Sequence, residues 1–385
     1  MTFGVLALIV AAGLIGPLLS GIRKLTIPLV VGEIGAGILL GVSGLGWLDT
    51  ADQTLQFLSN TGFAMLMFLV GTHLPLRDPS LRKALGRGLL ATVISFALAI
   101  PVAYLLARAT GVAHPALIVL LLATSSAAVV MPIVNERKLD GMTVLLTTTW
   151  VAVADTLTII ALPLAASTGK TLQIALGALI VIALAVASGF ALRAFYAAAV
   201  GEYYRALSKE RHWALDLRLS LILLFSLAAL ATHFGTSILV AGFAAGAVVS
   251  LVGEPHRFFK QLIGIAEGFF VPLFFVVLGA KLDFSKLLHS PVDLALTALL
   301  AVATTAVHLL AGKLARLPLA SGLTASAQLG VPAAVVSVGL ANNLLTDGQA
   351  AAIIAAALVS LVTCSIGTAL LARHSTAQPP PPAKP

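Results

Sequence analysis

Apolar runs long enough to cross a lipid bilayer recur along this 385-residue chain. A membrane-spanning helix needs about 18 or more mostly apolar residues. Hydrophobic residues make up 59% of the sequence and charged residues only 10%, whereas soluble domains carry about 25% charged residues. Inside lipid the backbone finds no water to bond, so it must satisfy its own polar groups. The fold class we predict is therefore an all-α polytopic membrane protein.

The apolar runs predict about 13 transmembrane helices. We interpret the first run as a retained helix and not as a cleaved signal peptide, because Arg23 and Lys24 follow it and no basic segment precedes it. Residues 1–373 then form one transmembrane domain, and the Pro-rich segment 374–385 is expected to be a disordered cytoplasmic tail. The predicted spans lie near 2–19, 26–45, 53–73, 86–107, 115–134, 142–165, 171–197, 214–233, 237–252, 261–280, 292–312, 319–341 and 349–372.

The basic residues fall mostly on one side of these spans. If the N-terminus lies outside, 19 of the 23 Lys and Arg residues face the cytoplasm. This positive-inside bias predicts an outside N-terminus and a cytoplasmic C-terminus in a prokaryotic inner membrane. The net charge of +8 is then a signal of topology, and no nucleic-acid partner is expected.

The number of spans predicts two six-helix inverted repeats, at about 2–165 and 214–372, joined by a linker helix at 171–197. Equivalent helices are seven places apart, an odd number, so they face opposite ways, as in many transporters. The equivalent segments Thr124–Pro132 and Gln328–Gly339 both combine proline with small or hydroxyl residues. This pattern predicts two broken helices whose free ends lie near the middle of the membrane.

Asp155 lies near the middle of the apolar run 142–165. Ionisable residues at this depth are costly and usually functional. Burial favours the protonated carboxyl group, whereas a bound cation favours the carboxylate, so a proton and a cation compete for it. Thr124, Ser125 and Ser126 are the candidate oxygen ligands for a monovalent metal ion at Asp155, either Na⁺ or K⁺. The alternatives are an Asp155 bonded to hydroxyls for packing only, and hydroxyl residues that merely allow close helix contact.

Other polar residues are candidates for an access pathway or for pH sensing. We favour a structural role for Glu33, while His308 is either a pH sensor or, as we favour, a neutral histidine bonded to a carbonyl. Lys313 is expected to extend to the cytoplasmic interface. The candidates are Glu33, Glu267, Thr304, Thr305, His308 and Gln328.

Signatures of enzymes and cofactors are absent from the sequence. The glycines of GEIGAGILLG follow no predicted strand, so they predict helix packing and not nucleotide binding. The single cysteine, Cys364, allows no intrachain disulfide and suggests no metal site. We expect a protein that is not an enzyme and that uses no cofactor.

Five segments occur in a characteristic order and spacing. They are IPLVVGEIGAGILLGVSGLG (27–46), GFAMLMFLVGTHLPL (62–76), ATSSAAVVMPIVNER (123–137), the Asp155 helix, and ILVAGFAAGAVV with FFVPLFFVVLGAKLD (within 238–283). In these segments the chain resembles the monovalent cation:proton antiporters of the Kef/Nap type, over residues 2–372. The resemblance implies a core domain, a dimerisation domain, broken helices that cross at the ion site, and a homodimer.

The resemblance also implies exchange of Na⁺ or K⁺ for H⁺ by alternating access, with Asp155 as the shared site. Electrogenic members have two adjacent acidic residues there, whereas Ala154 precedes Asp155 in this chain. We therefore predict electroneutral exchange. The family's mid-membrane lysine has no obvious match, because Thr304, Thr305 and His308 occupy that depth and Lys313 lies closer to the cytoplasmic end.

Three alternative functions stay open at this point. A sodium-coupled carrier on the same scaffold would need more polar groups near the site and a cationic contact. A potassium channel-like efflux pore would conduct faster than a carrier turns over. A homologue that does not transport is the third alternative, because of Ala154 and the missing lysine.

Overall fold

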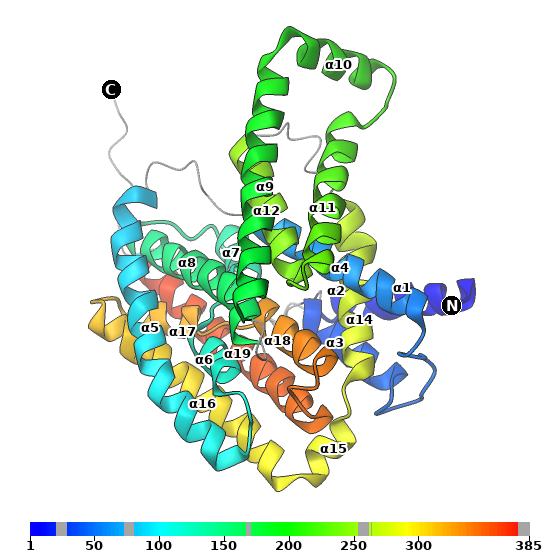
Figure 1. The fold of residues 1–385 in the computed structure, drawn as a ribbon. Helices are drawn as coiled ribbons and strands as arrows, with labels where there is room; N and C mark the ends of the chain where they lie inside the picture. The colour runs from blue at the N-terminus through cyan, green and yellow to red at the C-terminus, as the bar shows by residue number, and fades with distance from the viewer. Residues whose placement is uncertain (21–28, 73–80, 167–170, 253–261, 263, 376–385) are drawn as a thin grey trace. The chain divides into compact units, whose positions relative to one another are not determined.

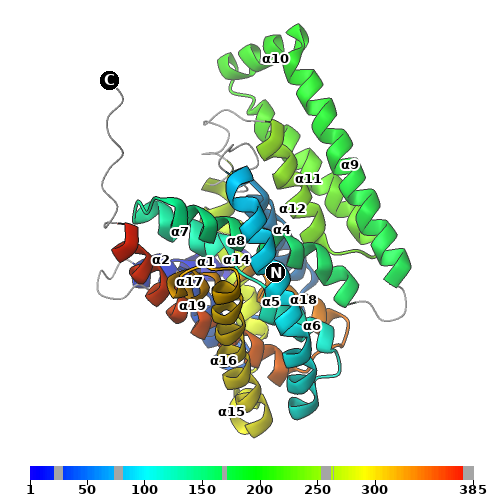
Figure 2. The ribbon, with the colours of Figure 1, turned by 90° about the vertical axis from the view of Figure 1, so that its left-hand side faces the viewer.

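The computed structural model describes residues 1–20, 29–72, 81–166, 171–252, 262 and 264–375, and every regular element in these ranges is a helix. The chain forms two compact units, each built from two separate stretches (Figures 1 and 2). Unit 1 consists of Met1–Arg77 and Ser167–Asp283, and unit 2 of Asp78–Ala166 and Phe284–Pro385. Each unit therefore joins stretches that are far apart in the sequence.

The helices have the length and composition of membrane spans. Four shorter apolar helices accompany the long ones, at Phe3–Leu19, Leu29–Leu40, Pro115–Met131 and Ile238–Val252. The prediction of an all-helical multi-pass protein is confirmed, and the count of thirteen spans stays a prediction. The eight helices long and apolar enough to cross a membrane are Gln53–Thr72, Ala84–Thr110, Met142–Ala165, Leu176–Ala197, Leu215–His233, Pro291–Leu314, Leu319–Ala341 and Asp347–Arg373.

Unit 1 is assembled by close contacts between helix backbones. Helix α4 packs along α12, and α3 packs along α14. Gly246 faces the Phe68 carbonyl and Gly37 faces the Val276 carbonyl, so a side chain at either glycine would force the helices apart. Gly37 thus supports the helix-packing interpretation of its segment. The elements are α1 (Phe3–Gly13), α2 (Ile15–Ser20), α3 (Leu29–Leu40), α4 (Gln53–Thr72), α9 (Thr171–Ala197), α10 (Ala199–Glu210), α11 (Leu215–His233), α12 (Ile238–Val252), the π-helical turn η1 (Ala266–Phe270) and α14 (Val271–Lys281).

Two chain segments differ from the sequence expectation. The segment after α9, which the predicted spans 171–197 and 214–233 leave outside any helix, forms the helix α10. Its polar face lowers the mean hydropathy and hides the helix from a hydropathy count. At the other end of the chain, α19 (Asp347–Ser375) continues two residues into the predicted tail, and residues 376–385 lie outside the described ranges.

Unit 2 contains two interrupted helices. Helix α6 ends at Ala123 and α7 begins at Ala127, while α17 ends at Ala325 and α18 begins at Gly330. Both predicted spans are thus interrupted, and both breaks precede the prolines that helped to predict them. The elements are α5 (Leu81–Thr110), α6 (Pro115–Ala123), α7 (Ala127–Glu136), α8 (Met142–Ala165), α15 (Phe284–His289), α16 (Pro291–Leu314), α17 (Leu319–Ala325), α18 (Gly330–Ala341) and α19.

Gly367 allows α19 to approach the first half of the second broken helix. A Cβ atom at Gly367 would lie 2.5 Å from the backbone nitrogen of Thr324 in α17. We expect Gly367→Ala to lower the free energy of unfolding by about 1–3 kcal/mol, because backbone atoms must move apart. The measurement is thermal unfolding of the purified protein in detergent. Gly86→Ala is the matched control, since nothing lies within 4 Å of its Cβ position, and equal losses in both variants would contradict this packing.

Candidate ion-binding site

Asp155 lies on α8 with its side chain 3% exposed. The first backbone N–H of α7, at Ala127, donates a hydrogen bond to Asp155 Oδ2 over 2.9 Å. The start of a helix carries a partial positive charge and unpaired N–H groups, both of which favour a carboxylate. The first break therefore provides Asp155 with an environment that can hold its charge.

Three hydroxyl residues form the break between α6 and α7, and all are buried. Thr124 Oγ1 lies 3.0 Å from Thr158 Oγ1 on α8. Ser125 Oγ donates to the Ala325 carbonyl, at the end of α17, over 2.6 Å. Ser126 Oγ has no hydrogen-bond partner among the residues that the structure describes. The segment thus joins the two broken helices and leaves one buried hydroxyl oxygen available.

Gln328 connects the second break to the first. Its side-chain nitrogen donates to the Leu121 carbonyl of α6 and lies 3.4 Å from Thr304 Oγ1 on α16. Its backbone N–H donates to Ser360 Oγ on α19 over 3.0 Å. The structure therefore brings Asp155, the hydroxyl segment, Thr304 and Gln328 together in unit 2.

His308 is buried beside the same break. Its Nδ1 lies 2.9 Å from the Thr304 carbonyl, and its Nε2 lies 3.4 Å from Ser125 Oγ. A carbonyl can only accept, so Nδ1 carries the hydrogen. The ring also stacks on Trp150, with the centroids 5.6 Å apart. Whether His308 acts as a neutral structural residue or as a pH sensor stays a prediction.

Thr305 and two glutamates complete the set of candidates. The Thr305 hydroxyl donates to the Ala301 carbonyl of its own helix over 2.9 Å. Glu33 is buried in α3 and Glu267 is exposed in η1, and both belong to unit 1. Their place in an access pathway stays a prediction. Lys313 is exposed in the last turn of α16, so His308 is the basic residue of that helix that faces the broken helices.

Several residues of the cluster were not anticipated. Thr158 follows Asp155 by three residues, a spacing that puts both on one helix face and would have identified it. Ser360 and Trp150 had no such signal, because their roles depend on which helix faces meet. Ser321 likewise accepts a 2.7 Å hydrogen bond from Thr147 across α17 and α8.

The chemistry of the cluster suits a single positive charge. Of the side chains described in unit 2, Asp155 is the one buried carboxylate. The described residues contain no group of three or more His, Cys, Asp or Glu side chains that could hold a metal ion together. One carboxylate with neutral hydroxyl and carbonyl oxygens can hold either a proton or a monovalent cation, but little more charge than that.

Comparison with known proteins identifies the family. The family model described as "Sodium/hydrogen exchanger, transmembrane" matches residues 8–373. The chain belongs to this sodium/hydrogen exchanger family. The family is one of transporters and not of enzymes, as the sequence predicts.

Relatives of this exchanger-family chain include named antiporters. The Na(+)/H(+) antiporter of Enterococcus hirae is 27% identical over 311 residues, which cover 78% of each chain. A Bacillus subtilis protein, YjbQ, named as a candidate Na(+)/H(+) antiporter, is 28% identical over 93% of this chain, which spans 61% of YjbQ. The solved structure of the sodium proton antiporter MjNhaP1 from Methanocaldococcus jannaschii has the same fold, with a TM-score of 0.62 and 15% identity over 96% of this chain and 98% of that one.

In this exchanger-family protein, we expect alanine substitutions at His308 and at Lys313 to differ in their effect on stability. We expect His308→Ala to lower the free energy of unfolding by about 2 kcal/mol or more, because it leaves a cavity beside Trp150 and removes a buried hydrogen bond. Lys313→Ala, on the exposed end of the same helix, should change it by less than about 0.5 kcal/mol. Thermal unfolding in detergent measures both. A larger loss for Lys313→Ala would show that the wrong basic residue has been assigned to the cluster.

Proposed function

We propose that the protein exchanges a monovalent cation, Na⁺ or K⁺, for H⁺ across the membrane by alternating access. The observation that carries the proposal is the contact of Asp155 with the first amide of α7, at the break between two half-helices. Membership of an exchanger family supports the reaction class. A relative from Bacillus cereus named as a Na(+)/H(+)-K(+) antiporter, 28% identical, supports either cation as the substrate.

Asp155 performs the exchange by binding one partner at a time. As a carboxylate it is stabilised by the Ala127 N–H and binds the cation, for which the Ser126 hydroxyl and nearby carbonyls are further oxygen ligands. As a carboxylic acid it carries the proton. Because Ala154 supplies no second carboxylate, each turn moves one cation one way and one proton the other. The exchange is therefore electroneutral.

The same proposal assigns roles to the two units. Unit 2 holds Asp155 and both broken helices, so it acts as the core domain that carries the ion. Unit 1 acts as the dimerisation domain of a homodimer. The positive-inside bias supports a prokaryotic inner-membrane location with the N-terminus outside and the C-terminus in the cytoplasm.

Asp155→Asn should abolish exchange, because an amide cannot release a proton or neutralise a cation. The measurement uses proteoliposomes that contain a trapped pH dye, to which Na⁺, K⁺ or Li⁺ is added in turn. The proton flux should fall to that of protein-free liposomes. Asp140→Asn, which changes an exposed carboxylate before α8, should keep the wild-type rate. Full activity in Asp155→Asn would refute the mechanism.

The same assay, run with the membrane voltage clamped at zero and at an imposed potential, tests the stoichiometry. An electroneutral cycle moves no net charge, so its rate should not change with voltage. Single-channel currents would instead identify a pore, and a clear voltage dependence would rule out one-for-one exchange.

Ala127→Pro tests the contribution of the helix start to the site. Proline is well tolerated at the first position of a helix but has no N–H group, so this variant removes the donor to Asp155. Hydrogen bonds to charged groups are worth about 1.5–3 kcal/mol, and we expect the KM for the cation to rise by about tenfold or more. Ala127→Gly keeps the N–H and is the control. An unchanged KM in Ala127→Pro, with normal thermal unfolding, would show that this amide does not support the bound cation.

A further inference from the structure

Helix α10 has one strongly apolar face that no other described element covers. Val200, Tyr203 and Tyr204 lie on this face and are 58%, 64% and 43% exposed. Glu202 and Arg205 lie on the opposite face of the helix. An amphipathic helix of this kind, with aromatic residues on its apolar side, is typical of helices that lie in the plane of a membrane interface.

Aromatic residues are concentrated around this helix. Three of the four tyrosines of the chain, Tyr196, Tyr203 and Tyr204, fall within nine residues. Trp213 follows shortly after and is 37% exposed. Tyr and Trp gather at the level of the lipid headgroups, because their rings prefer the apolar side and their polar atoms prefer the wet side. The cluster thus indicates the depth at which α10 lies.

The helix is fixed across the ends of two neighbouring spans. The Arg205 guanidinium lies 4.2 Å from the centroid of the Tyr196 ring at the end of α9, and its Nε lies 3.4 Å from Asp216 Oδ1 on α11. The Tyr196 hydroxyl donates to the same Asp216 oxygen over 3.0 Å. On the other side, the Leu215 N–H donates to Ser208 Oγ over 3.0 Å. These contacts hold α10 crosswise over the neighbouring ends of α9 and α11 (Figures 1 and 2).

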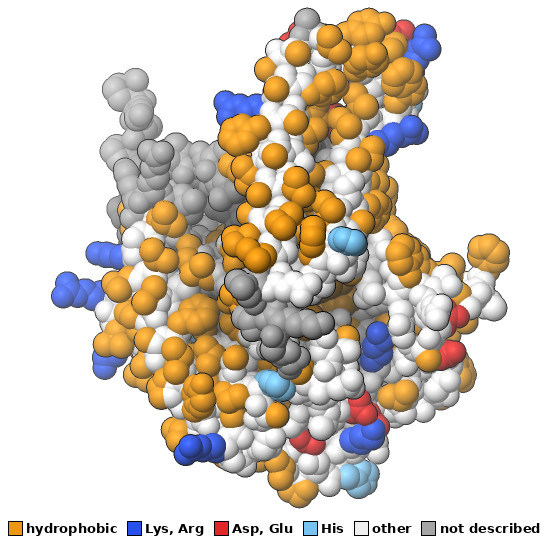
Figure 3. All heavy atoms as spheres, viewed as in Figure 1, with side chains coloured by type: hydrophobic (Ala, Val, Ile, Leu, Met, Phe, Trp, Pro, Cys, Tyr) orange, Lys and Arg blue, Asp and Glu red, His pale blue; other side chains and the backbone are white. Residues whose placement is uncertain are grey.

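The two spans themselves present surfaces for lipid. Helix α9 is 27 residues long, about 40 Å, which exceeds the hydrocarbon thickness of a bilayer. Its outer face is covered by hydrophobic side chains, including Phe190 at 71% exposure (Figure 3). If α9 crosses the bilayer, then α10 runs along the surface and not into the water. The basic residues near α10 assign this end of α9 and α11 to the cytoplasmic side of the membrane.

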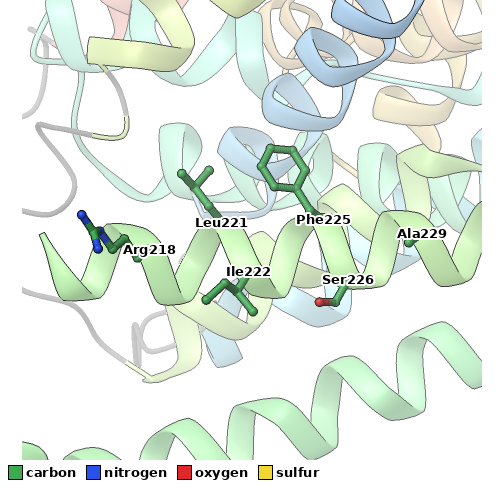
Figure 4. Close-up of a pocket in the computed structure, with 6 residues that line it drawn as sticks. All are labelled: Arg218, Leu221, Ile222, Phe225, Ser226 and Ala229. Carbon is green, nitrogen blue, oxygen red and sulfur yellow. The ribbon is translucent and has the colours of Figure 1, made fainter.

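A groove along α11 continues from the same end. It has an apolar wall of Leu221, Ile222, Phe225 and Ala229, and Arg218 stands at the end nearest to α10 (Figure 4). An acyl chain fits the apolar wall, and the phosphate of its headgroup would meet the arginine. Exposed Arg193 and Arg211 add positive charge at the same level, so the charge complements lipid phosphate groups.

We propose that α10 is a membrane-surface helix whose apolar face, Val200, Tyr203 and Tyr204, is embedded in the phospholipid headgroup layer of the cytoplasmic leaflet. The occupant of this face is lipid and not a protein. The embedded helix fixes the α9–α11 pair of unit 1 at a set depth in the bilayer. This proposal does not depend on which ion the protein carries.

Site-specific fluorescence in lipid nanodiscs tests the depth of α10. The full chain is first freed of its single cysteine by Cys364→Ala, and Tyr203→Cys or Glu202→Cys is then added and labelled with the environment-sensitive dye NBD. These neighbours point about 100° apart around the helix, one toward the apolar side and one toward the polar side, so they form a matched pair. In nanodiscs of phosphatidylcholine and phosphatidylglycerol, the label at 203 should emit at shorter wavelength. It should also be quenched several-fold more by doxyl-labelled phosphatidylcholine than the label at 202, which iodide should quench more strongly.

Two outcomes would overturn the proposal. Equal, water-like emission from both labels would place α10 away from the membrane. Blue-shifted emission at 203 without quenching by doxyl lipid would mean that protein, such as a second copy of the chain, covers the face. Should either labelled variant elute aggregated in size-exclusion chromatography, Val200→Cys and Ala206→Cys provide a second pair at exposed positions, with a contrast in the same direction. Because the readout is depth and not transport, it is independent of the Asp155 assays.

Discussion

Broken helices leave backbone groups unpaired where no water can reach them, and unit 2 depends on how these groups are satisfied. Each unpaired group in an apolar interior costs several kcal/mol. In the described structure, several of the groups at the breaks bond to side chains from other segments of unit 2. Asp155 accepts from the Ala127 N–H, Ser360 accepts from the Gln328 N–H, and Ser125 donates to the Ala325 carbonyl. The candidate ion site is therefore built from the same contacts that make the interrupted backbone tolerable.

The backbone N–H groups at the two breaks donate to similar acceptors, but the acceptor at the first break can carry a negative charge and the acceptor at the second cannot. Helix α8 is the next helix after the first broken helix, and α19 is the next helix after the second. In each case a side-chain oxygen of that next helix accepts a hydrogen bond from a backbone N–H at the break. That oxygen belongs to a carboxylate at Asp155 and to a hydroxyl at Ser360. A hydroxyl can satisfy the N–H but cannot bind a proton reversibly or neutralise a cation. In the proposed exchange the proton and cation chemistry is thus confined to one break, although the architecture has two.

The sequence identifies those parts of the site that are unusual at their depth in the membrane. A carboxylate in an apolar run is rare, and a Thr-Ser-Ser cluster beside a proline is a visible interruption, so the sequence indicates Asp155, Thr124, Ser125 and Ser126 as candidates, and their role as ion ligands stays a prediction. Ser360 and Trp150 could not, because ordinary residues acquire these roles only when particular helix faces meet. Helix α10 was not predicted from hydropathy, because its polar residues lower the mean hydropathy of the segment. Which stretches make up each of the two units was not apparent either, since each unit joins stretches that are far apart in sequence.

The environment of His308 bears on the proposed stoichiometry. In one-for-one exchange the loaded site is neutral in both forms, as a carboxylate with a cation or as a carboxylic acid. A neutral site can change its access without moving charge through a low-dielectric interior, where a buried charge is costly. A charged imidazole beside Ser125 would make both loaded forms positive. We favour a neutral ring at His308, which contacts the Thr304 carbonyl and Trp150, so that in the proposed exchange Asp155 is the group whose charge must be balanced at each turn.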